Sequence, residues 1–178
     1  MICQFTYETV LGDVTLVEED GALLSISLKS IQEGTEQETP IIQEAHRQIT
    51  EYLKGERKVF DLPIRLRGTD FQQQVWTALL DIPYGETRSY KQIAEAIGNP
   101  KGMRAVGMAN NRNPLLIVVP CHRVIGANGS LVGYGEGLEM KEFLLRLESS
   151  SLNYRTNCHS DDRREEDKLL RTLSEKSR

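Results

Sequence analysis

The sequence of 178 residues contains no long hydrophobic run. No window approaches the roughly 20 consecutive apolar residues that a membrane-spanning helix needs. The first residues, 1–8, also lack the basic stretch followed by a longer apolar one that is typical of an export signal. These absences argue against a membrane protein or a secreted one, and they predict a protein of the cytoplasm.

Cysteine and histidine are scarce, with three of each. The cysteines, Cys3, Cys121 and Cys158, are odd in number and widely spaced, which argues against a disulfide framework in such a chain. The histidines show no paired spacing suited to a metal, since Cys158 and His159 form only a lone adjacent pair. We therefore expect no metal and no cofactor, and no role follows for Cys3 or Cys158.

Positive charge is in the minority, because the formal net charge is −4. Its distribution is uneven: residues 88–123 contain six basic residues and one acidic residue, whereas residues 1–70 contain seven basic and thirteen acidic ones. A basic segment in an acidic chain predicts a face that binds a polyanion such as nucleic acid. A charged surface that only keeps the protein in solution is the alternative.

The first part of the chain has the pattern of a small antiparallel sheet covered by one helix. Apolar and polar residues alternate in three expected strands, residues 2–8, 13–19 and 23–28. Asp20-Gly21 predicts a hairpin turn, and residues 30–40 a polar loop. Helical spacing over 41–54 ends at Gly55. Residues 60–66 form either an edge strand or an extended connector before a domain boundary near Gly68.

The next part is predicted to be helical and to contain a helix-turn-helix. Asp70 as the cap, with Gln73 reaching back to it, opens one helix. A second helix is capped by Ser89 and stopped by Gly98, and residues 101–110 form a third. Helix, tight turn and helix is the arrangement of a common DNA-binding motif.

The last part begins with an apolar run, residues 115–119, that is either a short buried strand or a core segment, because Pro120 cannot continue a sheet ladder. Residues 138–148 predict an amphipathic helix, and the polar residues 149–178 a disordered tail. The predicted fold class is α+β: a small N-terminal antiparallel sheet with a covering helix, then a mainly helical domain with a helix-turn-helix.

Cys121 follows directly after that apolar run. His122 and Arg123 place two potential cations beside its thiol, and neighbouring positive charge lowers a thiol pKa from its usual value of about 8.5. The thiolate is the reactive form, so these neighbours predict a nucleophile. A small buried hydrophobic residue is the alternative, and it is the commoner role of a single cysteine.

Residues spaced along the second half match one family closely. They are Ser89-Tyr90, Gly98-Asn99-Pro100, Arg104-Ala105-Val106-Gly107, Asn113-Pro114, Pro120-Cys121-His122-Arg123-Val124, Gly133-Tyr134, Lys141, Leu144-Leu145 and Glu148. The segment resembles the methylated-DNA–protein-cysteine methyltransferases, also called O6-alkylguanine-DNA alkyltransferases, most strongly over residues 70–148. The resemblance implies a ribonuclease-H-like domain over residues 1–67 and a winged-helix-like domain for DNA binding and catalysis over residues 68–148.

The resemblance implies DNA repair by a single-turnover methyltransferase. Such a protein transfers a methyl or larger alkyl group from O6-alkylguanine, and from O4-alkylthymine, in double-stranded DNA to its own cysteine, and is inactivated by doing so. Because the lesion lies inside the duplex, the base has to be flipped out. A monomer without a cofactor is expected, with lesion-containing DNA as its partner and no membrane.

The resemblance also implies catalytic roles for five residues. Cys121 is the implied acceptor, His122 the base that deprotonates it, often through water, and Glu148 the residue that orients His122. Asn113 holds the turn before the acceptor, and Tyr90 helps to rotate the nucleotide and supplies a proton to the leaving base. Each has a plainer alternative: Tyr90 in the core, Glu148 paired with an arginine, and Asn113 capping a turn.

The resemblance places the recognition helix in the minor groove, where Arg104 fills the place of the flipped base. The other implied DNA-binding residues are Lys101, Ala105, Arg112 and Arg123. The implied substrate pocket is bounded by Val124, Tyr134 and Gly135. Gly135 stands where some family members have a serine.

Two other functions fit part of the pattern. A helix-turn-helix protein that binds lesions without chemistry explains the basic segment but not Cys121, His122 and Glu148. A cysteine hydrolase explains Cys121 and His122, although their adjacency in sequence makes a direct contact between them hard to build.

Overall fold

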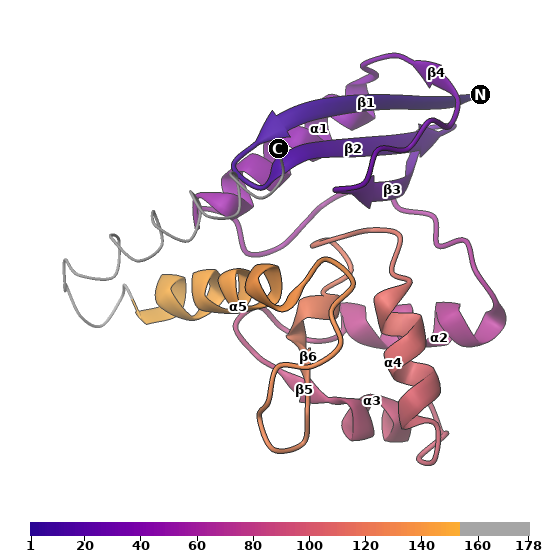
Figure 1. Cartoon of the computed structure of the whole chain (residues 1–178). Helices are drawn as coiled ribbons and strands as arrows, with labels where there is room; N and C mark the ends of the chain where they lie inside the picture. The colour runs from indigo at the N-terminus through magenta and orange to yellow at the C-terminus, as the bar shows by residue number, and fades with distance from the viewer. Residues whose placement is uncertain (154–178) are drawn as a thin grey trace. The chain divides into compact units, whose positions relative to one another are not determined.

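The structure, a computed structural model, describes residues 1–153 and contains two compact units (Figure 1). The first unit comprises Met1–Arg65 and the described residues from Arg146 onward, and the second comprises Leu66–Leu145. Residues 154–178, most of the predicted tail, lie outside the described residues. The α+β fold class is confirmed, whereas the division into domains at residue 67 stays a prediction.

Alternating polarity forms the sheet of the first unit. β1 (Ile2–Thr9), β2 (Gly12–Glu19) and β3 (Ala22–Ser27) are consecutive antiparallel strands, as predicted. Asp20 and Gly21 form the turn between β2 and β3 with φ angles of 50° and 79°. These left-handed values are the ones that a two-residue hairpin turn requires, and an Asp-Gly pair adopts them readily.

A fourth strand makes the sheet mixed, which corrects the prediction of a purely antiparallel sheet. β4 (Thr35–Glu36) is parallel to β1 and lies in the segment expected to be a polar loop. The Gln37 amide donates a hydrogen bond to the Gln4 carbonyl (2.9 Å). Gly34 comes so close to Ile2 that a Cβ would lie 2.3 Å from the Ile2 carbonyl oxygen. A strand of two polar residues has no alternation by which its sequence could indicate it.

α1 (Pro40–Leu53) lies across one face of this sheet (Figure 1). Its buried residues are Ile42, Ala45, Gln48, Ile49 and Tyr52. The helix ends just before Gly55, whose φ of 75° suits the residue after a helix, as predicted. Ile64 forms an isolated parallel bridge with Leu23, so residues 60–66 are an extended connector rather than a strand.

The second unit begins with α2 (Asp70–Leu80), whose cap lies one residue before the predicted one. The Thr69 hydroxyl accepts a hydrogen bond from the Gln72 amide (3.2 Å), and the Gln72 side chain accepts one from the Thr69 amide (3.0 Å). The predicted pair, Asp70 and Gln73, is therefore wrong. Both pairs fit the capping pattern, but only Thr69 still has the extended backbone (φ −63°, ψ 160°) of a cap residue.

α3 (Tyr90–Ala96) and α4 (Met103–Asn111) form the predicted helix-turn-helix. Gly98, with φ of 76°, follows α3 as expected. α4 begins later than predicted, so Lys101 lies in the turn and not on the helix. The reason is Gly102, whose amide donates to the Asn99 carbonyl (2.9 Å) and so closes the turn before the helix. The flexibility of a glycine also disfavours a place inside a helix.

The apolar run, residues 115–119, is a buried core segment and not a strand. Ile117 has a φ of 71°, which interrupts an extended course of the chain. The strand comes after Cys121 instead, where β6 (Val124–Ile125) pairs in parallel with β5 (Arg88–Ser89).

α5 (Leu138–Asn153) continues past the predicted end at residue 148, so the start of the predicted tail at Ser149 is wrong. The Ser150 hydroxyl donates to the Arg146 carbonyl (2.8 Å). This bond satisfies the serine hydroxyl within the helix, so the serine does not have to end it. α5 begins in the second unit and ends in the first.

Candidate active site

Two consecutive tight turns determine the position of Cys121. In the first turn the Val118 amide donates to the Leu116 carbonyl (2.8 Å), and Ile117 between them has a φ of 71°. In the second turn the Cys121 amide donates to the Val119 carbonyl (2.8 Å), and Pro120 between them has a φ of −82° and a ψ of 63°. Both are γ-turns, and the form with positive φ is the rare, strained one. The thiol thus stands at the start of a 3₁₀ turn, η1 (Cys121–Arg123).

Two asparagine side chains hold this segment. Asn113 Nδ2 donates to the Cys121 sulfur (3.1 Å) and to the Val119 carbonyl (2.7 Å), and its Oδ1 accepts from the Leu115 amide (3.0 Å). Asn110 Nδ2 donates to the Cys121 carbonyl (3.2 Å). Asn113 therefore spans the turn before Cys121. Asn110 is not among the predicted residues, because its place on the buried side of α4 follows only from the fold.

Burial raises the pKa of the Cys121 thiol, because a side chain that is only 4% exposed is poorly solvated as an anion. The hydrogen bond from Asn113, the nearby Tyr134 side chain and the charge of Lys141 act in the opposite direction. The net direction is upward, so the prediction of a lowered pKa is wrong for the protein without DNA.

Arg123 does not act as the predicted cation beside the thiol. It is buried, its Nη1 donates to the Ile82 carbonyl (2.6 Å), and its guanidinium carbon lies 5.7 Å from the centroid of the Tyr84 ring. Residues two apart in a 3₁₀ turn point in different directions, because each residue turns the chain by about a third of a circle. Adjacency in sequence therefore did not bring this charge to Cys121.

Lys141 on α5 is the cation that acts on the thiol. It is fully buried, and burial lowers its pKa to about 8 against the opposing effect of Cys121. Its Nζ donates to the Val132 carbonyl (3.0 Å) and lies 5.7 Å and 6.0 Å from the ring centroids of Tyr90 and Tyr134. Lys141 is one of the residues that match the family motif, but the sequence predicts no role for it. A lysine on the apolar side of a predicted helix is the signal that points to it, because lysines are rarely buried.

A mostly apolar hollow of about 270 Å³ lies beside Tyr90. Its lining consists of Tyr90, Met103, Arg104, Gly107, Asn111, Val132 and Gly133. The Tyr90 hydroxyl donates to the Val132 carbonyl (2.8 Å), and the Gly133 carbonyl lies at 3.3 Å. Burial, and then the neighbouring Cys121, raise the pKa of Tyr90. The hollow thus joins Tyr90, which is close to the thiol, to Arg104 on α4.

None of the three residues predicted to bound the substrate pocket is among those that line this hollow. Val124 is buried in β6 and Tyr134 is buried in the loop before α5. A Cβ at Gly135 would lie 3.2 Å from the Asn111 carbonyl oxygen, so a serine there requires a small shift. The glycine permits a close approach of this loop to α4.

His122 and Glu148 belong to different units. His122 is fully buried in η1, in the second unit. Glu148 is buried near the end of α5, in the first unit, and its Oε1 accepts a hydrogen bond from the Tyr52 hydroxyl (2.7 Å). The second unit therefore holds Cys121, His122, Asn113 and Tyr90 together. Tyr52, which lies far from Glu148 in the sequence, is not a predicted neighbour of it.

The predicted basic segment exposes fewer charges than its sequence contains. Three of its basic residues are exposed and form no ion pair within the described part of the chain, namely Lys101, Arg104 and Arg112. Arg88 and Lys91 lie near acidic side chains, at 3.7 Å and 4.0 Å. Ala105 is exposed next to Arg104. That Arg123 contacts DNA stays a prediction, and the structure does not favour it, because this side chain is buried and its guanidinium donates to the Ile82 carbonyl.

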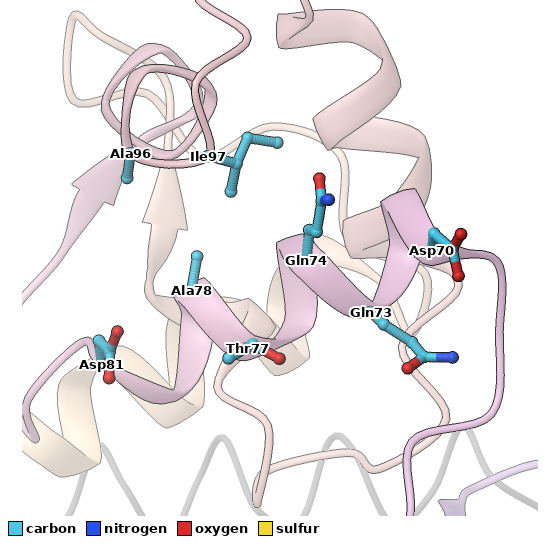
Figure 2. A pocket seen from close by; sticks show the side chains of 8 residues that line it. All are labelled: Asp70, Gln73, Gln74, Thr77, Ala78, Asp81, Ala96 and Ile97. Carbon is cyan, nitrogen blue, oxygen red and sulfur yellow. The ribbon is translucent and has the colours of Figure 1, made fainter.

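A larger hollow, of about 560 Å³, follows α2 (Figure 2). Gln74 and Ala78 of α2 face Ile97 at the end of α3, and Asp70 and Asp81 stand at the two ends of the hollow (Figure 2). No predicted site residue lines it. Its charged side chains are carboxylates, which do not suit a polyanion.

Two features are absent from residues 1–153, a cluster of metal ligands and a membrane-spanning helix. This part of the chain contains no group of three or more His, Cys, Asp and Glu residues that could hold a metal ion. None of its helices combines the length and the apolar character needed to cross a bilayer.

Two protein-family profiles match the chain. Residues 2–66 match 6-O-methylguanine DNA methyltransferase, ribonuclease-like domain. Residues 70–150 match 6-O-methylguanine DNA methyltransferase, DNA binding domain. Together they cover nearly all the residues that the structure describes.

Individual proteins are similar to the chain over most of their length. The methylated-DNA–protein-cysteine methyltransferase of Methanosarcina acetivorans is 49% identical over 150 residues, which cover 81% of this chain and 96% of that protein. The constitutive protein of the same name from Bacillus subtilis is 49% identical over 156 residues, covering 82% and 94%. Mycobacterium tuberculosis OGT, crystallised in complex with DNA, has a TM-score of 0.78 at 47% identity, covering 84% of this chain and 94% of that one.

Proposed function

The chain belongs to the 6-O-methylguanine DNA methyltransferase family, and we propose that Cys121 is the cysteine of this chain that accepts the alkyl group. Members of this family, this protein included, repair DNA by transferring the alkyl group to one of their own cysteines. The observation that supports Cys121 is its setting, since its sulfur accepts a hydrogen bond from Asn113 and interacts with the buried Lys141. Cys3 instead lies in β1, where its sulfur faces the Gln37 side chain (3.8 Å).

The proposed reaction is one displacement at the alkyl carbon. The Cys121 sulfur forms a bond to that carbon as the bond from carbon to the guanine oxygen breaks. The thiol proton leaves through His122, which Glu148 orients, and the departing base takes up a proton from Tyr90. The product is a thioether, which water does not hydrolyse, so each molecule acts once. The protein is therefore a methyltransferase that turns over only once.

The proposed substrate is double-stranded DNA that contains O6-alkylguanine, and we include O4-alkylthymine. The exposed residues Lys101, Arg104, Ala105 and Arg112 would contact the DNA, and Arg104 would take the place of the flipped base. Small residues on α4 suit the minor groove, since they allow the helix to come close. We propose that the protein acts as a monomer, because one chain supplies every residue that this reaction uses, and that it does so in the cytoplasm.

The test is the intact mass of the protein after incubation with excess duplex DNA that carries O6-methylguanine. We expect one added methyl group on the peptide that contains Cys121, with the reaction stopping at one equivalent. Cys121→Ser should bind the lesion duplex without gaining mass. A bound duplex with no mass change in the natural protein would favour lesion binding without chemistry, and repeated turnover would contradict a stoichiometric acceptor.

A further inference from the structure

Two side chains converge on one backbone carbonyl in the loop between β6 and α5. The Val132 carbonyl accepts hydrogen bonds from the Tyr90 hydroxyl (2.8 Å) and from the Lys141 ammonium (3.0 Å). The loop, residues 126–137, contains Gly129, Gly133 and Gly137 with positive φ. Residues 132–133 line the apolar hollow and Tyr134 lies near the thiol, so the carbonyl is part of the pocket wall.

The Tyr90 hydroxyl has a single proton to donate. In this structure that proton is directed at the Val132 carbonyl, with the Gly133 carbonyl as a longer neighbour at 3.3 Å. A hydroxyl used in this way cannot at the same time supply its proton to a departing base. Tyr90 therefore has to leave Val132 before it can serve the reaction proposed above.

We propose that Tyr90 exchanges the Val132 carbonyl for the alkylated base when the base enters, and that Lys141 is the positioning residue that holds Val132 during this exchange. The inference rests on the proposed function of Tyr90 as the proton donor. The Val132 carbonyl is then the resting partner of the Tyr90 hydroxyl, and Lys141 acts on the pocket wall as well as on the thiol.

Lys141 is suited to this role by its own contacts. Its three protons allow it to keep the Val132 bond whatever Tyr90 does, and its own side chain is fully buried while Val132 lies at the surface. A carbonyl oxygen has two lone pairs, so both donors can be bound at once. When Tyr90 leaves, the Val132 carbonyl still has Lys141 as a partner, so this acceptor is not left unsatisfied. The exchange is therefore easier than the removal of a sole hydrogen bond.

The resting contact can be tested in the free, full-length protein by NMR. Labelling valine carbonyls with ¹³C and glycine amides with ¹⁵N selects two peptide groups, Val106–Gly107 and Val132–Gly133, because the chain has only these two Val-Gly pairs. We expect Tyr90→Phe to move the Val132 carbonyl resonance and leave that of Val106 in place. Tyr7→Phe, whose hydroxyl bonds to Glu38 in the first unit, is the matched control. An unmoved Val132 resonance in Tyr90→Phe would overturn the assignment.

The exchange itself is tested with Cys121→Ser and a duplex containing O6-methylguanine. We expect the Val132 resonance to move on binding in the same direction as in Tyr90→Phe. If the duplex binds, as judged by the Gly107 amide on α4, and Val132 stays in place, then the exchange does not occur. Failure of the proposed function is distinct from this result, because it appears as the absence of methyl transfer in the intact-mass experiment.

The role of Lys141 is tested by hydrogen exchange of the peptide that covers residues 126–137. With Lys141 present, binding of the lesion duplex should leave its exchange unchanged or slower. In Lys141→Met, binding should make it several times faster, since Val132 then loses both donors. Lys141→Gln, which keeps a donor, should restore part of the protection, and Lys91→Met controls for the loss of a charge. Equal exchange in free and bound Lys141→Met would contradict the positioning role.

Discussion

Two opposing effects act on the thiol of Cys121. Burial favours the neutral thiol and raises its pKa, whereas the Lys141 ammonium favours the thiolate. Lys141 itself has a pKa of about 8, so its charge is lost just above neutral pH. The support that it gives to the thiolate therefore decreases as the pH rises past this value.

We expect Lys141→Met to raise the pKa of Cys121 further. Below about pH 8, where Lys141 is charged, alkylation of Cys121 by iodoacetamide should be slower in the variant than in the natural protein. At higher pH the two rates should converge, because the lysine is then neutral in the natural protein. The measurement is the pH dependence of the mass change on the Cys121 peptide, with Lys91→Met as the control. A profile that shifts to lower pH would contradict the argument.

Ile117 combines strain with burial. A β-branched residue at φ of 71° costs about 1–2 kcal/mol, whereas truncating a side chain that is 2% exposed costs roughly 2–5 kcal/mol. The loss of buried contacts outweighs the relief of strain, so both Ile117→Ala and Ile117→Gly should lower the free energy of unfolding. Because glycine tolerates positive φ, Ile117→Gly should be at least as stable as Ile117→Ala.

Leu115 is the control position for the alanine and glycine variants of Ile117. Leu115 is fully buried in the same segment and is not among the described residues with positive φ. There the glycine variant should be less stable than the alanine variant by about 0.5–1 kcal/mol. Urea unfolding of the four variants gives the two differences. The same order at both positions would mean that the turn at Ile117 is not as described.

At the level of elements, the helix-turn-helix divides its residues by depth. Val106, Ala109 and Asn110 of α4 are buried, and Asn110 bonds to the Cys121 carbonyl. Arg104 and Ala105 are exposed on the same helix. One helix thus contributes both to the position of the proposed acceptor and to the surface proposed for DNA.

The exposed and buried arginines of this region should respond differently to replacement. Arg112→Ala should weaken binding to a duplex without a lesion and reduce the slope of log affinity against log salt by about 1, as expected when one phosphate contact is lost. Arg123→Ala should leave that slope unchanged and lower the thermal midpoint, since its guanidinium bonds to the Ile82 carbonyl. A reduced slope in Arg123→Ala would show that Arg123 reaches DNA after all.

At the level of the whole molecule, the first unit is completed by the end of the described chain. Glu148 of α5 and Tyr52 of α1 are both buried, and their hydrogen bond joins residues that are 96 positions apart. A buried carboxylate requires donors, because an unsatisfied charge is expensive in a low dielectric. The bond therefore supports the packing of α1 as well as the position of Glu148.

Tyr52→Phe should lower the free energy of unfolding by about 1–3 kcal/mol, the usual effect of taking one partner from a buried charged group. Tyr7→Phe removes a hydroxyl that bonds to the exposed Glu38 and should cost less. Urea unfolding of the full-length variants measures both. Equal losses would indicate that the Tyr52 bond is no stronger than one at the surface.

Local patterns predicted most of the elements correctly. The three long strands, the helices and the Asp20-Gly21 turn depend on residues within a few positions of one another. The motif around Cys121 predicts the acceptor segment for the same reason, since its spacing is read directly from the sequence. The start of α2 was missed by one residue because Thr69 and Asp70 both fit the cap, and the start of α4 by two because Gly102 closes the turn before it.

Contacts between distant segments could not be predicted. The short strand β4, the bond of Tyr52 to Glu148 and the two donors on Val132 each join segments that only the fold brings together. The charge beside Cys121 is the clearest case. Sequence neighbours suggested Arg123, whereas the folded chain directs Arg123 elsewhere and supplies Lys141.

The course of α5 affects the order in which the protein can fold during its synthesis. Residues 1–65 leave the ribosome first, yet the partner of the Tyr52 hydroxyl is made 96 residues later. At synthesis rates of about 5–20 residues per second, that interval is roughly 5–20 s. During it α1 is present without Glu148, and the whole second unit emerges. The first unit is therefore incomplete until α5 has been synthesised, and a ribosome that stalls within the second unit leaves the first one without its last helical turns.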